Sequence, residues 1–253
     1  MLPVMNRHSE PRGVFPGLRR HVAKLRGYTW WLTACLVQGL LLVSSAAQTS
    51  EFLPEIDLYK KLDPSVRLSF QAKHTREDGS ATQAEVGPTI DFYLKPLLSL
   101  KRVSSYDLDE SKSRALVLSF GYRYVPSPGS PAVNRILFQG TSNLPFKANL
   151  LLSNRSRGEL NFSNGNLTWR YRNRSTIERS LNIRSYHPAL YVSGEAYYTS
   201  SYRKWSSTAL SAGALFPIRT HTQLDVYYQH ENNTGKTPNQ QINALGTALS
   251  LHF

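Results

Sequence analysis

The sequence contains one cysteine, no long apolar run beyond its first 47 residues and no helical periodicity, and each shortage excludes a class of protein. Cys35 alone allows no intramolecular disulfide in a chain of 253 residues. After residue 47, no apolar run approaches the roughly 18–20 residues of a transmembrane helix. Apolar residues there do not recur at the spacing of an amphipathic helix. These absences favour an all-β chain.

Common motifs for catalysis and for cofactor or metal binding are also missing from the sequence. It contains no G-x-S-x-G, no Walker A motif and no G-x-G-x-x-G. No two histidines stand at i, i+2 or i, i+4, and there is no H-E-x-x-H. We therefore expect no cofactor, no metal site and no catalytic residue that a motif identifies.

The first 47 residues have the pattern of a secretory signal peptide. Basic residues precede an apolar run from Trp30 to Val43, and Ser45-Ala46-Ala47 follows. The run is about 14 residues, too short for the ~20 of a spanning helix. We predict a signal peptide over 1–47 and a mature domain over 48–253. The alternatives are an uncleaved N-terminal anchor, or lipid attachment at Cys35.

The mature segment alternates apolar and polar residues at a period of two. The repeating segments are about 9 to 12 residues long, as a tilted strand needs to cross a bilayer. Examples are Val66–Lys73 and Leu116–Tyr124. The last segment, Asn243–Phe253, places leucines on one face and ends on an aromatic residue, which is typical of the closing strand of an outer-membrane barrel. We therefore predict an all-β fold, a transmembrane antiparallel β-barrel of about ten to twelve strands.

The strand number is expected to be even, as in bacterial single-chain barrels, and is centred on twelve. Ten strands account for the chain from Val66 to Phe253. The segment Glu55–Leu62 is then an extra strand with a missed partner or a piece packed in the lumen. A further strand is considered within Leu97–Leu108.

The connections between these segments are expected to alternate between short periplasmic turns and longer outer loops. Short turns are predicted at Asp63-Pro64, Leu144-Pro145 and Pro217–Thr220. Longer polar loops are predicted at Thr75–Thr82, Pro126–Ala132, Asn154–Gly165 and Glu231–Gln241. Aromatic residues make up 11% of the chain, and many stand near segment ends, where membrane interfaces favour them.

Charged residues on the polar faces are expected to line the barrel lumen, because charge on the lipid face costs about 2–4 kcal/mol at the bilayer midplane. The candidates are Arg67, Lys73, Asp91, Arg123, Arg170, Arg172, Arg174, Glu195 and Asp225. One interpretation is a network in which the arginines neutralise the three acidic residues and fill a narrow barrel. The other is a positively lined pore that favours anions.

Several strand-like motifs resemble a bacterial family of uncharacterised outer-membrane barrels defined by a domain of unknown function, DUF2490. They are Leu58–Leu62, Phe-Gly-Tyr-Arg-Tyr at Phe120–Tyr124, Trp169–Arg174, Gly-Glu-Ala-Tyr-Tyr at Gly194–Tyr198 and Leu224–His230. The resemblance extends over nearly all of the mature segment. It implies a small outer-membrane barrel and no established activity.

The sequence thus predicts an integral protein of the bacterial outer membrane with a structural or passive pore role. Expected partners are outer-membrane lipids and the barrel-insertion machinery, which would recognise the strand ending at Phe253. The formal charge of +13 comes from basic residues scattered singly along strands, so no nucleic-acid partner is expected. One alternative is a lipid- or lipopolysaccharide-modifying enzyme using His230 with Ser200 or Ser201. The other is a soluble exported β-sandwich or lipocalin-like barrel that binds an apolar ligand.

Overall fold

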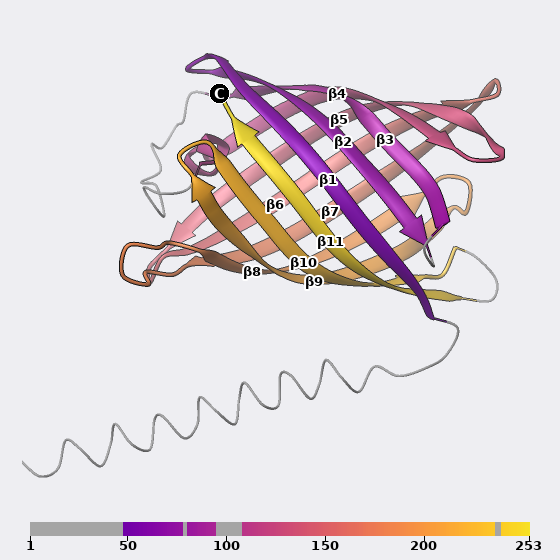
Figure 1. Ribbon diagram of the computed structural model, residues 1–253. Helices are drawn as coiled ribbons and strands as arrows, with labels where there is room; N and C mark the ends of the chain where they lie inside the picture. The colour runs from indigo at the N-terminus through magenta and orange to yellow at the C-terminus, as the bar shows by residue number, and fades with distance from the viewer. Residues whose placement is uncertain (1–47, 78–79, 95–107, 236–238) are drawn as a thin grey trace, which may run out of the picture. The chain divides into compact units, whose positions relative to one another are not determined.

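A computed structural model describes residues 48–77, 80–94, 108–235 and 239–253 (Figure 1). The signal peptide predicted over 1–47 lies outside these residues, as does the segment 97–108 apart from its last residue. The elements are β1 (Gln48–Asp63), β2 (Val66–Glu77), β3 (Ser80–Tyr93), η1 (Glu110–Ser113), β4 (Leu116–Ser127), β5 (Ser130–Phe146), β6 (Leu150–Ser163), β7 (Asn166–Ser180), β8 (Ala189–Thr199), β9 (Lys204–Arg219), β10 (Thr222–Asn233) and β11 (Gln240–His252).

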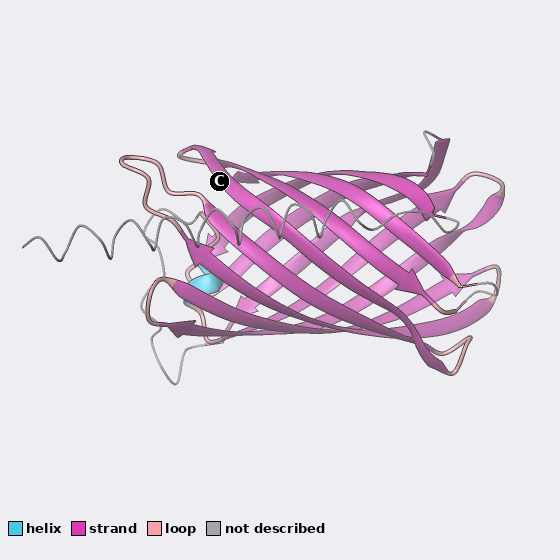
Figure 2. Cartoon of the chain, turned by 90° about the horizontal axis from the view of Figure 1, so that it is seen from below, coloured by secondary structure: helices cyan, strands magenta, loops and turns pink. Residues whose placement is uncertain are grey.

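The eleven strands form a closed barrel in chain order, with β1 hydrogen-bonded to β11 (Figures 1 and 2). Each consecutive pair is antiparallel, whereas β1 and β11 run parallel, with Ile56 opposite Leu249. The prediction of an antiparallel barrel of about ten to twelve strands is confirmed. The expected even number, centred on twelve, is wrong. The segment Glu55–Leu62 belongs to β1, and its missed partner is β11.

The two ends of the barrel differ in their connections. With an odd number of strands, the chain enters the barrel at one end and leaves it at the other. We call these the Gln48 end and the Phe253 end. The longer connections, from β3 to β4 and from β7 to β8, lie at the Phe253 end. At the Gln48 end, the loops expected over 126–132 and 154–165 are mostly strand. The turn expected at Leu144-Pro145 lies within β5, so these parts of the loop prediction are wrong. Asn164 and Gly165 have φ of 46° and 75°, as a tight hairpin turn requires.

The alternation of the sequence separates two faces of the wall. Over most strands the outer face is apolar: Phe120 is 46% exposed and Leu249 lies beside Ile56, which is 50% exposed. The inner face is polar, and Arg123 there is only 4% exposed. Within the described ranges, no helix is long and apolar enough to span a membrane.

Aromatic rings gather on the outer face of β7, β8 and β9 toward the Gln48 end. Trp169 stacks on Tyr198 at a centroid distance of 5.3 Å, and Trp205 meets Tyr198 edge-on at 5.9 Å. Amphipathic rings of this kind are favoured where a membrane meets water.

The parallel closure predicts which cysteine pair will cross-link. Neighbouring strands lie about 4.8 Å apart, within reach of a disulfide. In a Cys35→Ser background, Ile56→Cys with Leu249→Cys should form a disulfide on oxidation, seen as a mobility shift on non-reducing gels. Ile56→Cys with Leu245→Cys is the control, because four residues along a strand add about 13 Å. Cross-linking of the control pair alone would contradict the eleven-strand register.

Candidate functional site

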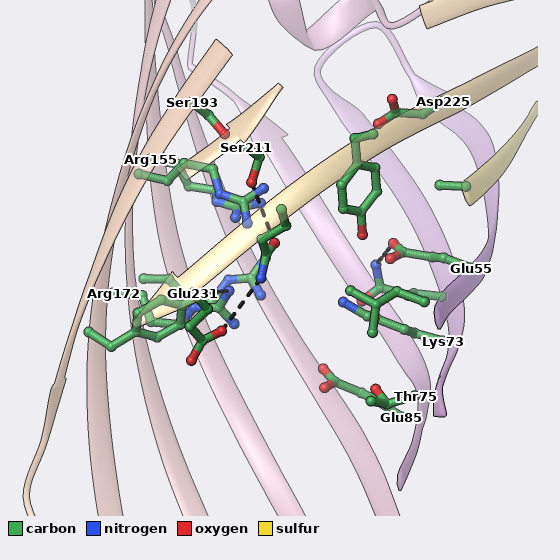
Figure 3. Close-up of a pocket in the computed structure, with 18 of the residues that line it drawn as sticks. Glu55, Lys73, Thr75, Glu85, Arg155, Arg172, Ser193, Ser211, Asp225 and Glu231 are labelled. Carbon is green, nitrogen blue, oxygen red and sulfur yellow. Dashed lines mark hydrogen bonds between the residues drawn. The ribbon is translucent and has the colours of Figure 1, made fainter. Parts of the chain in front are cut away.

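The barrel encloses a cavity of about 740 Å³ that extends along the lumen (Figure 3). Its walls reach from Ser207 and Glu231 toward the Gln48 end to Lys112 and Glu178 toward the Phe253 end. Eight acidic and eight basic side chains of the described chain line it. The cavity is therefore strongly charged but close to neutral, which does not match a lumen of one sign.

The basic side chains are concentrated on three consecutive strands, β5, β6 and β7. The period of two places every second residue of these strands in the lumen. The arginines that line the cavity from this wall are Arg135, Arg155, Arg157, Arg170, Arg172 and Arg174. We call this group the arginine wall. Packing so many cations together is possible only where acidic groups lie among them.

Glu159 and Glu195 supply that compensation beneath the arginine wall. The Glu159 side chain is fully buried, and its carboxylate lies 2.6 Å from Arg170, 3.2 Å from Arg172 and 3.6 Å from Arg135. Glu195 accepts hydrogen bonds from Arg172 at 3.0 Å and from Arg174 at 2.5 Å. Each carboxylate thus binds several guanidinium groups, which fixes the arginine side chains in place.

Acidic side chains dominate the opposite side of the lumen. Glu51, Glu55 and Asp57 on β1 and Asp225 and Glu231 on β10 line the cavity. In a ring of eleven strands, β10, β11 and β1 lie across the barrel from the arginine wall. Figure 3 shows Arg155 and Arg172 across the open space from Glu55 and Asp225. We call this second group the acidic wall, and the two walls impose an electric field across the lumen.

The segment around η1 lies in the mouth of the barrel at the Phe253 end (Figure 2). Asp109 binds Arg67 of β2 at 2.7 Å, and Lys112 binds Glu178 of β7 at 2.8 Å. The Asn143 amide of β5 donates to the Ser111 carbonyl oxygen at 3.0 Å. Because β2 lies across the eleven-strand ring from β7, with β5 two strands away from β7, the η1 segment spans the opening.

The Asp109 carboxylate is held charged in this position. Burial alone would raise its pKa, but the charges of Arg67 and Lys112 outweigh that effect and lower the pKa well below the ordinary 3.8. A lowered folded-state pKa contributes stability that is present above the ordinary value and lost only as pH falls through the lowered one. The contact between η1 and β2 therefore persists into strongly acidic solution.

The structure places all nine residues proposed from sequence on the inner face, in three settings. Arg67 pairs with Asp91 at 2.8 Å, away from the main arginine group, and Arg123 donates to Gln71 at 3.1 Å. Lys73 lines the cavity near the acidic wall. Of the other candidates, Arg170, Arg172 and Arg174 belong to the arginine wall, Asp225 belongs to the acidic wall, and Glu195 binds Arg174 beneath the arginine wall.

Asp225 differs from the role proposed for it. The sequence paired it with a luminal arginine, whereas it accepts the hydroxyl of Tyr191 at 3.0 Å. Sequence reasoning also missed Arg155, Arg157 and Glu159, because it assigned them to a loop. Their own period of two, followed by the Asn-Gly turn at Asn164, was the signal for a strand.

The residues considered for an enzyme do not meet. His230 stands between cavity-lining residues of β10 and so faces outward, where its Nδ1 lies 2.8 Å from Asn243 Oδ1. Ser200 Oγ accepts the backbone N–H of Trp169 at 2.9 Å, while Ser201 lines the cavity. Across the described ranges, no hydrogen bond joins His230 to either serine. Within the same ranges, no group of three or more His, Cys, Asp or Glu side chains is arranged to hold a metal ion.

Strand order and luminal charge define this molecule as a closed β-barrel protein with a polar interior. The chain belongs to the family described as "Protein of unknown function (DUF2490)", whose match covers residues 55–242. No curated protein matches it. Among solved structures, in-vitro folded OmpT, an outer membrane protein of Vibrio cholerae, is similar with a TM-score of 0.30 and 8% identity, over 76% of this chain and 90% of that one. At this TM-score the similarity adds nothing to the strand pairing itself.

Glu159 should be the most sensitive single residue of the site. Glu159→Gln keeps the shape but leaves the surrounding arginines without their shared anion. We expect the free energy of unfolding to fall by about 3 kcal/mol, which is the lower end of the range for breaking a buried ion pair. The lower value applies because the arginine side chains still reach the cavity. Glu231→Gln, which removes a carboxylate bound by Ser207 at 2.6 Å, should cost less than about 1 kcal/mol. Urea unfolding of the two variants in lipid vesicles measures this, and equal losses would argue against a central role for Glu159.

Proposed function

We propose that this protein is an integral barrel of the bacterial outer membrane that gives small polar solutes a passive route through its lumen. The observation that carries the proposal is a charged cavity with opposed arginine and acidic walls inside a barrel with a largely apolar exterior. The C-terminal strand is proposed to be recognised by the barrel-insertion machinery.

The exterior supports a location in lipid. Large apolar side chains are exposed on both halves of the barrel, as with Phe70, Phe138, Leu210 and Leu245. Exposed apolar residues at every second position of a closed barrel cost free energy in water but not in hydrocarbon. The strands are 11 to 17 residues long, enough to cross a tilted bilayer path and extend beyond it.

The charge arrangement indicates the class of solute. A lumen of one sign would select ions of the opposite sign. Here the arginine wall attracts the anionic end of a solute while the acidic wall attracts its cationic end. Solutes that carry both charges, or a strong dipole, are therefore favoured over simple anions, and this replaces the anion-selective pore considered from sequence.

The η1 segment makes the route a narrow one in the resting state. Its contacts through Asp109–Arg67 and Lys112–Glu178 involve largely buried carboxylates and cations. The third ion pair, Lys61–Glu110, has side chains 43% and 36% exposed. Exposed pairs contribute little, so the first two contacts are proposed to hold η1 in the mouth.

Location is tested by fractionation and by behaviour on gels. The protein should be recovered with outer membranes and should migrate differently before and after boiling, because a closed barrel resists detergent until heated. Recovery of the folded protein as a soluble periplasmic species, without detergent, would contradict the membrane assignment and favour the lipocalin-like alternative.

Conductance across planar bilayers tests the route and the role of η1 together. Wild type should show small single-channel currents without strong anion preference. Asp109→Asn combined with Lys112→Met should raise the conductance several-fold by releasing η1. The matched control, Lys61→Met combined with Glu110→Gln, removes the exposed pair and should behave as wild type. A folded, inserted double variant that conducts no current would overturn the pore proposal.

A further inference from the structure

The outer face of the barrel carries a group of polar side chains at mid-height on β5, β6 and β7. The residues are Ser142, Asn154, Ser156, Asn173 and Ser175, and we call them the amide patch. Their strand neighbours Arg155, Arg157, Arg172 and Arg174 line the lumen, so the period of two points the amide patch outward. Strand pairing places Ser142 opposite Asn154, Asn154 opposite Ser175, and Ser156 opposite Asn173.

Apolar side chains border the amide patch toward both ends of the barrel. On β5, Ser142 lies between Phe138 and Leu144, which are 44% and 53% exposed. On β7, Asn173 and Ser175 lie between Tyr171 and Ile177. The patch therefore interrupts the apolar exterior near its middle, where a bilayer would present hydrocarbon. This step rests on the membrane location proposed above, but not on the pore.

The polar atoms of the patch form a local network. Asn154 Nδ2 donates to Ser175 Oγ at 2.9 Å and to Asn173 Oδ1 at 3.2 Å, and Asn173 Nδ2 donates to Ser156 Oγ at 2.9 Å. In these bonds Ser156 and Ser175 act as acceptors. Ser156 Oγ also accepts the Tyr171 hydroxyl at 3.2 Å, and neither serine hydroxyl donates a hydrogen bond to any residue of the described chain, so each proton lacks an acceptor there. Lipid chains offer no acceptor for it.

Glycines make the wall around the amide patch shallow. Gly140 and Gly158 lie on the same outer face of β5 and β6, and Gly194 lies opposite Ser175 on β8. A Cβ built on Gly158 would meet no atom within 4 Å. Small residues of this kind let two backbones approach closely inside a membrane, where packing and polar contacts drive association.

We propose that the amide patch is the surface on which two copies of this protein associate within the membrane. A second copy is the occupant that the chemistry fits, because carboxamide and hydroxyl groups both donate and accept. The same uncharged patch, turned about a twofold axis, offers an acceptor for every donor and brings no repulsion between identical surfaces. A charged patch would repel its own copy, and a lipid chain would offer the serine hydroxyl protons no acceptor.

The association is tested by filling the shallow wall without disturbing the barrel. Gly158→Leu places an apolar side chain in open space, so the isolated barrel should fold and resist heat as wild type does. It should weaken the dimer by about tenfold or more in dissociation constant, as loss of close packing and polar contacts implies. The matched control is Ala72→Leu on the outer face of β2, on the other side of the barrel, which should leave the dimer intact.

The measurement is sedimentation equilibrium of the full chain in density-matched detergent micelles, with co-purification of two differently tagged copies from the same membranes. Asn154→Leu with Asn173→Leu is a second variant, expected to be monomeric while keeping the heat-modifiable mobility of a folded barrel. A wild type that is monomeric in both assays would overturn the proposal, as would equal association of wild type, Gly158→Leu and the double variant. A soluble wild type would instead refute the membrane location.

Discussion

Hydrogen bonding between the first and last strands is the interaction on which the rest of this barrel depends. An open sheet would leave two rows of backbone N–H and C=O groups at its edges without partners in the sheet. Eleven strands leave β1 and β11 pointing the same way, so they close the ring through a parallel ladder. The junction is reinforced where Tyr59 stacks on His252 at 4.8 Å and where Lys61 N–H donates to the Phe253 carbonyl oxygen at 3.1 Å.

The geometry of the closed ring determines which charged side chains face one another in the lumen. A strand that alternates between faces must place its charged residues in the lumen, and the strand order then decides which of them face each other. Because β6 lies opposite the β11–β1 junction, the arginines of β5–β7 confront Glu55 and its neighbours rather than pair with them. Carboxylates on the same side of the lumen, such as that of Glu159, neutralise the arginine wall. The cavity lies between these two walls (Figure 3).

Much of this fold could be predicted from the sequence, and the exceptions have physical causes. Alternation is a local property, so the strands, the inner face and residues such as Arg67, Arg172 and Glu195 could be inferred from neighbours alone. The pairing of β1 with β11 joins residues nearly 200 positions apart, and the pattern of neither strand records its partner. The prediction of a loop over Asn154–Gly165 was wrong for another reason. From Asn154 to Gly158, the outer face of this segment carries no apolar side chain, so the contrast between apolar and polar faces was absent there, and Glu159 was missed with it.

Polar side chains on both faces over part of their length distinguish β6 and β7 from the rest of the wall. On the inner side, Arg155 and Arg172 are compensated by carboxylates within the same chain. On the outer side, Asn154 and Asn173 hydrogen-bond to each other and to serines, a network that satisfies amide donors but leaves hydroxyl protons facing outward. Replacing these residues by leucine would cost the barrel's pairing nothing, because the strand hydrogen bonds belong to the backbone. Their polarity is therefore not required by the closure of the barrel, and a contact outside the single chain gives it a physical reason.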